Sequence, residues 1–385
     1  MDRREFMTTT GAAALSAWVP GAVLAAGAAR YDNLLVLVEL KGGNDGLNTV
    51  VPYADAEYYS LRPRIAVARD QVLQLDASSG LHPSLQPLMA LWQNRELAVV
   101  QSVGYPSANL SHFRSIEIWD TASKSDQYLS DGWLTRAFAE TPVPRSFAAD
   151  GVVVGSNEMG PLAGAGTRAL ALTNTDQFLR QARLAGGEGV AGNPALAHIL
   201  KVERDVTQAA AHIGANVALR TEFPNHAFGN ALKTAAQVVA SKAGVAVVKV
   251  SHNGYDTHGG QQGTQQRLLK ELAEGLVAMR AALQELGRWD STLMMTYCEF
   301  GRRPRENASG GTDHGTANAH FVTGGRVRGG LYGLPPALTR LDGHGNLPFA
   351  VDFRDLYATA LTRWWGINAA GALNGRFAPL DLLRA

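Results

Sequence analysis

The chain has 385 residues and a net charge of +1, with 46% hydrophobic and 18% charged residues. This composition is typical of a globular protein with a large core, and it excludes a disordered chain and broad electrostatic attraction to nucleic acid or an anionic membrane. The one cysteine, Cys298, excludes an internal disulfide. We therefore expect core packing, with or without a bound metal, to hold the fold together.

The first residues form a targeting pattern. Arg3 and Arg4 make a basic pair, and residues 8–26 are weakly apolar and rich in small side chains. This pattern is typical of a twin-arginine export signal. The alternative is a membrane anchor, which a stretch poor in Leu and Ile and interrupted by Gly and Pro does not favour. We expect residues 1–28 to be read by the twin-arginine translocation machinery, and the mature protein to be periplasmic or extracellular without a stable membrane anchor.

Apolar runs without polar alternation predict strands that are buried on both faces. In chain order these runs are 34–40, 97–100, 152–154, 245–250, 292–297 and the shorter 321–322. The helices predicted between them are 85–92, 194 to about 219, 228–242, an amphipathic stretch from Leu268 to Leu286 closed by Gly287, and 353–364.

Strands that alternate with helices predict an α/β fold, with a mostly parallel sheet and helices on both faces. We expect residues 29–385 to form a single domain. The helical pair within about residues 190–243 is expected as a cap or insertion on that domain.

Polar motifs follow the predicted strands, and the carboxyl ends of parallel strands meet at one edge of a sheet. The candidate residues in these motifs are Asp45, Ser111, His112, Asp256, His258, Glu299, Asp313 and His314. Carboxylates and imidazoles that converge in this way are ligands for a divalent ion. A mixed oxygen and nitrogen set favours zinc or manganese, and a carboxylate-rich position also suits magnesium or calcium.

Each motif also has an ordinary structural explanation. Asp45 lies in a Gly-Gly-Asn-Asp-Gly sequence that is typical of a turn, and Ser111 or Asp256 could cap a following helix. Glu299 could simply pair with Arg302. Five such motifs at five strand ends nevertheless favour a shared site over five unrelated local roles.

An ordered set of motifs spans nearly all of the mature chain. It includes the twin-arginine start, Gly42-Gly-Asn-Asp-Gly-Leu-Asn48, Ser111-His-Phe113, Tyr255-Asp-Thr-His258, Glu299-Phe-Gly-Arg302 and Gly311-Thr-Asp-His-Gly315. The set resembles the DUF1501 family, which is uncharacterised in function. That family is similar in fold to the alkaline phosphatase-like superfamily, which includes sulfatases and cofactor-independent phosphoglycerate mutases. The resemblance therefore implies a metal site at the sheet edge and a hydroxyl nucleophile, without naming a substrate.

The resemblance also assigns roles to particular residues. Asp45 matches the acidic metal ligand that follows the first strand, and Ser111 matches the nucleophile. Asp256 and His258 resemble the Asp-x-x-x-His pair of the superfamily, with a shortened spacing.

Two alignments compete for the remaining metal ligands. By residue identity, Asp313 and His314 match the adjacent Asp-His pair of the superfamily. By topology, Glu299 takes the place of that Asp, and His314 matches a later His that precedes a strand. We favour the second alignment because the run at 321–322 follows His314 closely. It leaves Phe300 where a His ligand is expected.

These motifs and the resemblance indicate an exported metal-dependent hydrolase of a phosphate or sulfate ester. Ser111 would attack the phosphorus or sulfur, and His112 is expected beside it as a ligand or supporting group. Arg302 would clamp the anionic oxygens, with Arg114 and Arg303 as alternatives. The alternative function is a non-catalytic or degenerate family member with a role in secretion or cell-surface assembly.

Overall fold

The computed structural model describes residues 28–172, 218–241 and 244–384. Nearly all of the expected export signal and of the helix expected from residue 194 to about 219 lies outside the described residues. Among the helices of the described part, none combines the length and the apolar character that crossing a bilayer needs.

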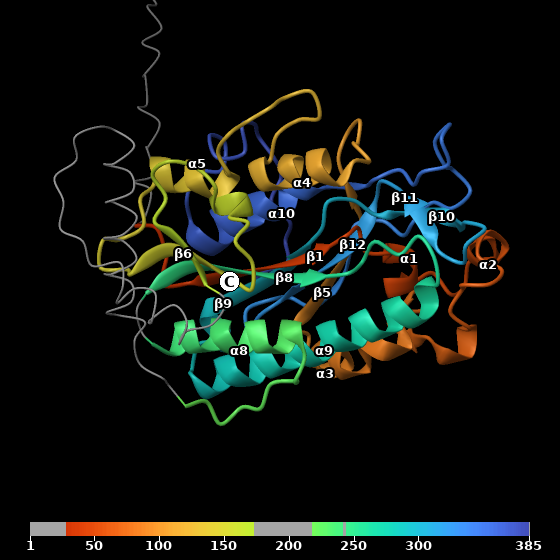
Figure 1. Ribbon diagram of the computed structural model, residues 1–385, viewed down its shortest axis with the longest axis horizontal. Helices are drawn as coiled ribbons and strands as arrows, with labels where there is room; N and C mark the ends of the chain where they lie inside the picture. Colours follow the sequence, from red (N-terminus) through yellow and green to blue (C-terminus); the bar gives the residue numbers. More distant parts are fainter. Residues whose placement is uncertain (1–27, 173–217, 242–243, 385) are drawn as a thin grey trace, which may run out of the picture.

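A central sheet runs through the described part of the chain (Figure 1). Its nine strands follow the order β13, β5, β12, β9, β1, β8, β6, β7, and β14 also pairs with β5. Their bounds are β1 Leu34–Lys41, β5 Leu97–Gly104, β6 Ala149–Val154, β7 Ala169–Leu172, β8 Val245–Asn253, β9 Thr292–Tyr297, β12 Asn318–Thr323, β13 Gly330–Tyr332 and β14 Val351–Asp352. All six predicted apolar runs lie in strands of this sheet.

Strand pairing is parallel throughout this sheet except at β12, which is antiparallel to both β5 and β9. The predicted mostly parallel α/β sheet is therefore confirmed. The reversal has a consequence for the site, because Asn318 at the start of β12 pairs with Val103 near the end of β5. Residues that precede β12 thus lie at the same edge as residues that follow the parallel strands.

Helices cover both faces of the sheet (Figure 1). On one face lie α3 (Met89–Gln93), α8 (Ala227–Ala240) and α9 (Gln261–Glu285), and on the other lie α4 (His112–Thr121), α5 (Trp133–Glu140) and α10 (Phe353–Ala358). A 3-10 helix, Pro83–Leu88, leads into α3, and a π-helix, Thr359–Trp365, continues α10. Pro87 lies inside the predicted helix 85–92 and lacks the N–H that a regular α-helix needs, which accounts for the 3-10 first half.

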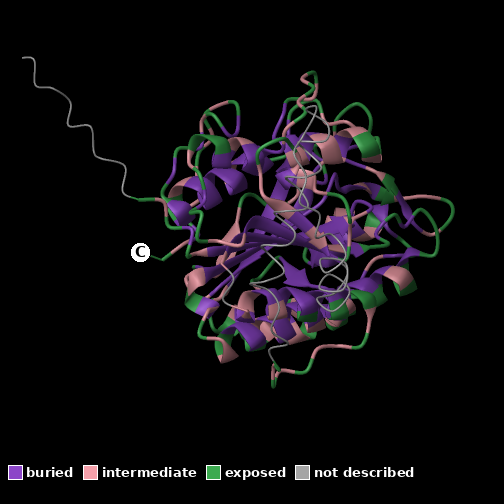
Figure 2. Ribbon diagram, turned by 60° about the vertical axis from the view of Figure 1, so that its left-hand side comes forward, coloured by how far each residue is buried: buried purple, intermediate pink, exposed green. Residues whose placement is uncertain are grey.

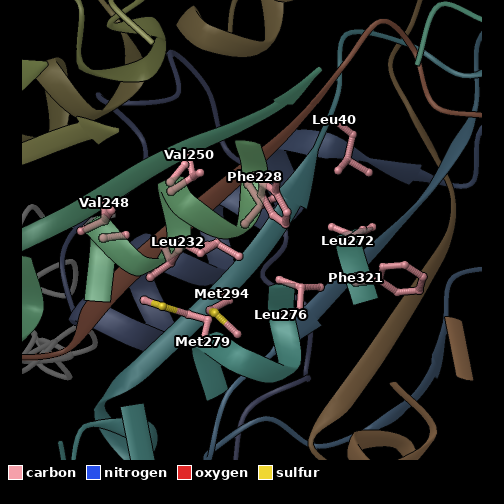
Figure 3. Packing of buried hydrophobic residues seen from close by; sticks show 14 of the residues in the cluster. Leu40, Phe228, Leu232, Val248, Val250, Leu272, Leu276, Met279, Met294 and Phe321 are labelled. Atoms are coloured by element: carbon pink, nitrogen blue, oxygen red, sulfur yellow. The ribbon is translucent and has the colours of Figure 1, made fainter. Parts of the chain in front are cut away.

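Each helical layer encloses a core. Under α8 and α9, Phe228, Leu232, Leu276 and Met279 pack onto Met294 of β9 and its neighbours (Figure 3). Buried tryptophans dominate the opposite core, on the side of α4, α5 and α10: Trp119, Trp133, Trp364 and Trp365. Figure 2 shows buried residues in the sheet and on the inner helix faces, with exposed residues outside. The amphipathic pattern predicted for α9 is confirmed by this packing.

Smaller elements extend the carboxyl edge of the sheet. They are α1 (Gly46–Thr49), α2 (Ala56–Leu61), a three-stranded sheet of β2 (Val50–Val51), β4 (Gly80–Leu81) and β3 (Leu73–Gln74), and the antiparallel pair β10 (Arg302–Glu306) and β11 (Thr312–His314). This pair turns the chain back before β12, and it thereby places the end of β11 beside the loops that follow β1 and β8.

Candidate functional site

Three side chains from distant parts of the chain meet at the carboxyl edge. His112 begins α4, Asp256 lies in the loop between β8 and α9, and His314 ends β11. One ligand atom from each residue lies within 4.8 Å of the ligand atoms of the other two. Within the described ranges, this is the group of His, Cys, Asp and Glu side chains whose spacing suits a metal ion.

His258 joins this group through its Nε2 atom. That nitrogen lies 2.9 Å from Nε2 of His314 and 3.0 Å from Oδ1 of Asp256. Nδ1 of His314 lies 2.8 Å from the carbonyl oxygen of Leu110, which can only accept a hydrogen bond. Nδ1 therefore carries the proton in the neutral ring, and Nε2 presents its lone pair to the cluster.

Glu299 supports His112 from behind. It is buried, and its Oε1 atom accepts a hydrogen bond from the Gly42 amide at 2.9 Å and lies 2.8 Å from Nδ1 of His112. This hydrogen bond raises the pKa of His112 above its ordinary value. Nε2 of His112 then faces Asp256, with 3.4 Å between Nε2 and Oδ2. The other oxygen of Glu299, Oε2, is buried and has no hydrogen-bond partner in the described residues.

Asp313 has a similar position behind a different ring. Its Oδ1 atom accepts a hydrogen bond from Nδ2 of Asn307 at 3.1 Å and lies 3.4 Å from Nδ1 of His258. Glu299 and Asp313, the acidic residues that the two competing alignments offered as ligands, thus have the same position. Each contacts the cluster through a histidine that it orients.

Asp45 does not join the group that the sequence placed it in. Its Oδ1 atom caps α1 by accepting hydrogen bonds from the amides of Leu47 and Asn48. Its Oδ2 atom lies 2.6 Å from Nη1 of Arg62 and also accepts a hydrogen bond from Gln261. Both oxygens are thus occupied, so the local structural explanation accounts for this motif.

Arg302 is fully buried, and each of its three guanidinium nitrogens already donates to an acceptor of the protein. Its guanidinium donates to the carbonyl oxygens of Gly42, Gly43, Tyr255 and Thr312, and to Oδ1 of Asp256 at 2.6 Å. Burial alone would raise the pKa of Asp256, but the hydrogen bond and charge of Arg302 outweigh it and lower that pKa to about 2. Arg302 therefore positions and ionises Asp256, which corrects its assignment as an oxyanion clamp.

The other predicted clamp, Arg114, is also engaged, because it donates to three backbone carbonyls and pairs with Glu117. The buried Nε atoms of Arg114 and Arg303 both lack a hydrogen-bond partner among the described residues. Phe300, at the position where a His ligand was expected, packs its ring against His112 and His314, with centroid distances of 4.8 Å and 4.4 Å.

Ser111 is the N-cap residue of α4, but its side chain makes no capping hydrogen bond. It is exposed, and it lies between Leu110 and His112, which both contact the cluster. The capping role is therefore not made by this side chain, and the hydroxyl of Ser111 is exposed in the residue that precedes His112.

A cavity of about 580 Å³ adjoins the cluster, with His112 and Glu299 in its wall. Glu39 and Asp120 also line it, and Lys249 lies behind it in an ion pair with Glu39. Sequence reasoning missed these three residues. A lone charged residue inside an apolar strand, as at Glu39 and Lys249, is a signal that could have found two of them, whereas Asp120 sits in an ordinary amphipathic helix.

A model of the family described as "Protein of unknown function (DUF1501)" matches residues 66–372. No curated protein matches the chain. Similar solved structures include the zinc complex of the C-terminal periplasmic domain of EcEptC from Escherichia coli, with 10% identity, coverage of 76% of this chain and 73% of that chain, and a TM-score of 0.39. The PsFucS1 sulfatase from Pseudoalteromonas sp. has 11% identity, coverage of 91% and 70%, and a TM-score of 0.42. A protein in the alkaline phosphatase superfamily from Vibrio parahaemolyticus has 10% identity, coverage of 91% and 70%, and a TM-score of 0.40.

Proposed function

This chain belongs to the DUF1501 family, and from the side chains at its sheet edge we propose that it is an exported metal-dependent hydrolase of phosphate or sulfate esters. The observation that supports the proposal best is the arrangement of three histidines and one carboxylate. Nε2 of His112, His258 and His314 all lie within 3.4 Å of an oxygen of Asp256. Imidazole nitrogens and a carboxylate oxygen gathered at these distances are the kind of donor set that binds a divalent cation such as zinc.

The rings are also held as metal ligands usually are. Glu299 lies behind His112, Asp313 lies behind His258, and a backbone carbonyl lies behind His314. Partners of this kind set the tautomer and raise the basicity of a ligating imidazole. A set of three nitrogens and one carboxylate favours zinc or manganese over magnesium and calcium, which prefer oxygen.

A divalent ion held by these residues would lower the pKa of a nearby hydroxyl, and its positive charge would stabilise the ester oxygens. Ser111 would attack the phosphorus or sulfur, so that its Oγ forms a bond as the alcohol leaves, and water would then release the acid. Arg302 keeps Asp256 ionised at neutral pH, and Phe300 shields two of the histidines from solvent.

The alternative is a non-catalytic family member with a role in secretion or cell-surface assembly. Two observations favour it: Phe300 occupies the place of an expected His ligand, and Asp45 is committed to Arg62 and α1. A single-metal site is compatible with either function, so activity is what separates them.

Metal content comes first. We expect about one equivalent of zinc or manganese in the mature protein purified after export. Chelation should lower the melting temperature, because an ion that binds only the native state stabilises that state. His258→Ala and His314→Ala should each abolish binding. A protein that is metal-free and indifferent to added zinc and manganese would contradict the proposal.

Activity is tested with a panel of phosphate and sulfate esters. Wild-type protein should cleave at least one, and Ser111→Ala should reduce turnover by a factor of roughly 100 or more, with Ser60→Ala, an exposed serine of α2, as the matched control. A folded Ser111→Ala variant with normal turnover would remove Ser111 from the mechanism. A metal-bound protein without activity on any ester would favour the non-catalytic alternative.

A further inference from the structure

The cavity beside the cluster runs along one face of α4. His112 lies at the start of that helix, and Phe113, Ile116 and Asp120 line the same cavity. These positions recur at helical spacing, so they share a face. The eight steps from His112 to Asp120 correspond to ~12 Å of helix axis, which is enough for an aromatic ring and a short side chain.

One wall of the cavity is apolar and open. Phe113 exposes 89% of its surface, and Ile116, Leu129 and Ala163 lie in the same wall. A large aromatic residue that is exposed at the mouth of a site is covered when a ligand binds, and burial of apolar surface then favours binding. The wall therefore suits a flat apolar group.

The end of the cavity farthest from the cluster is acidic. Glu39 of β1 and Lys249 of β8 are each 1% exposed, and Oε2 of Glu39 lies 2.8 Å from Nζ of Lys249. Ser251 donates a second hydrogen bond to Glu39, and Lys249 donates one to the carbonyl oxygen of Glu158. The charge of Lys249 is thus matched by Glu39 alone.

Asp120 adds a second carboxyl group to this buried pair. A Cβ placed on Gly160 would lie 3.0 Å from Oδ1 of Asp120 and 3.1 Å from Cε of Lys249, so the carboxyl and the ammonium stem lie against the same glycine. The hydroxyl of Tyr297 donates a hydrogen bond to Oδ1 of Asp120 that is long, at 3.5 Å. Asp120 therefore lies close to the Glu39–Lys249 pair without forming an ion pair with Lys249.

Glu299 in the cavity wall contacts His112, and the remaining acidic residues of the wall other than Asp120 already have cations. Glu158 pairs with Lys41 at 2.6 Å, and Glu117 pairs with Arg114 at 2.9 Å. Asp120 forms no ion pair with any residue in the described ranges. Burial and the charge of Glu39 raise its pKa well above the usual range of an aspartic acid, against the lowering effect of Lys249. This carboxyl is stabilised when it gains either a proton or the positive charge of a ligand.

We propose that this cavity binds the organic part of the ester, and that it selects an aromatic group carrying a primary amine, with the ring on Phe113 and the ammonium on Asp120. This inference rests on the proposed function, because it leaves the acidic end of the ester to the cluster at His112.

Binding of the product alcohol tests the cavity without any chemistry. The probes are tyramine and 4-ethylphenol, which differ by the amine, and titration calorimetry on the metal-loaded mature protein compares them. Tyramine should bind at least about tenfold more tightly, because hydrogen bonds to charged groups are stronger than neutral ones. Asp120→Asn should remove the difference, whereas Asp126→Asn, an exposed aspartate outside this cavity, should keep it.

The apolar wall has its own test. Phe113→Ala should weaken both probes about equally, and Leu334→Ala, another exposed apolar residue, should weaken neither. Phe113 is exposed, so this variant leaves the core untouched even if Asp120→Asn were to unfold. Equal affinity of the wild type for tyramine and 4-ethylphenol would overturn the amine selection. No effect of Phe113→Ala would overturn the placement of the ring.

Hydrolysis separates this inference from the function on which it rests. The substrates are the phosphate and sulfate esters of the same two phenols, and the amine-bearing ester should have the higher kcat/KM. If both esters are cleaved equally and tyramine binds no better, the cavity assignment fails while the hydrolase stands. If tyramine binds through Asp120 but neither ester is cleaved, the cavity assignment stands and the hydrolase fails.

Discussion

Asp45 and Asp256 show that the neighbours of a carboxylate decide whether it has a structural or a ligand-binding role. Both follow strands of the same sheet, and both accept a hydrogen bond from a buried arginine at 2.6 Å. Asp45 is buried with all its acceptors used by Arg62, Gln261 and α1, whereas the side chain of Asp256 is 46% exposed and faces three imidazoles. The first carboxylate therefore serves the fold, and the second is available to a ligand.

The same substitution at these two positions should give opposite results. Asp45→Asn leaves the buried charge of Arg62 without its anionic partner, so the free energy of unfolding should fall by about 3 kcal/mol or more while metal affinity is kept. Asp256→Asn retains the acceptor for Arg302 but loses the anionic ligand, so metal affinity should fall at least tenfold with little change in apoprotein stability. Urea unfolding of chelator-treated protein and metal titration check both. Loss of metal by Asp45→Asn at unchanged stability would reverse the assignment.

Helices α8 and α9 depend on a close contact at Gly275. A Cβ at this position would lie 2.7 Å from Cε1 of Phe228 and 2.8 Å from Cδ1 of Leu232, and both of those side chains are buried. Glycine weakens the interior of a helix, but here it lets the two helices approach each other and cover the sheet (Figure 3).

Gly275→Ala should therefore destabilise the protein despite the better helix propensity of alanine. Overpacking in a buried contact costs about 1–3 kcal/mol, which exceeds a propensity gain of about 1 kcal/mol. Gly263→Ala in the same helix is the control, because nothing lies within 4 Å of the added Cβ. That variant should gain about 0.5–1 kcal/mol. Chemical denaturation measures both, and a stabilised Gly275→Ala protein would mean that the helices are not in tight contact there.

Three buried histidines tie the stability of the whole molecule to pH. Burial lowers the pKa of His82 and of His252 to about 4 and that of His320 to about 3. In the unfolded chain each would take up a proton near pH 6.5. Because the unfolded state then binds more protons than the folded state, the free energy of unfolding should decrease as the pH falls from about 6.5 towards 4.

Denaturation of chelator-treated protein between pH 7.5 and 4.5 measures this loss. His320→Phe should flatten the dependence, since neither ring nitrogen of His320 has a hydrogen-bond partner in the described part of the chain and its contact with Trp119 is aromatic. His344→Gln, at an exposed position, should leave the slope unchanged. Stability that stays constant over this range would contradict the burial of these rings.

The export that we propose concerns the whole chain and would depend on residues outside the described ranges. Replacing Arg3 and Arg4 together by Lys should leave an unprocessed cytoplasmic precursor, because the twin-arginine machinery reads the pair itself and not its charge alone. Arg145→Lys, an exposed site in the folded part, should be exported normally. Cell fractionation with immunoblotting decides, and processed double variant in the periplasm would show that another signal is used.

The sequence by itself determined the sheet and most of the cluster. Runs such as Leu34–Leu40 can be buried on both faces only inside a layered α/β fold, so composition and spacing sufficed to predict it. His112, Asp256 and His258 lie at one edge as expected because they follow parallel strands, whereas His314 reaches the same edge because it precedes the reversed strand β12.

Tertiary structure alone decided the direction of β12, the roles of Asp45 and Arg302, and the cavity at Asp120. A strand pattern has the same period in either direction, so it cannot show that β12 is reversed. A carboxylate or guanidinium takes its role from its partners, and the partners of Asp45 and Arg302 come from other segments: Arg62 and Gln261 for the aspartate, and the loops after β1 and β8 for the arginine. Asp120 lies beside the ion pair of Glu39 and Lys249 only because folding brings β1, β8 and α4 together. The sequence around Asp120 gives no sign of these neighbours.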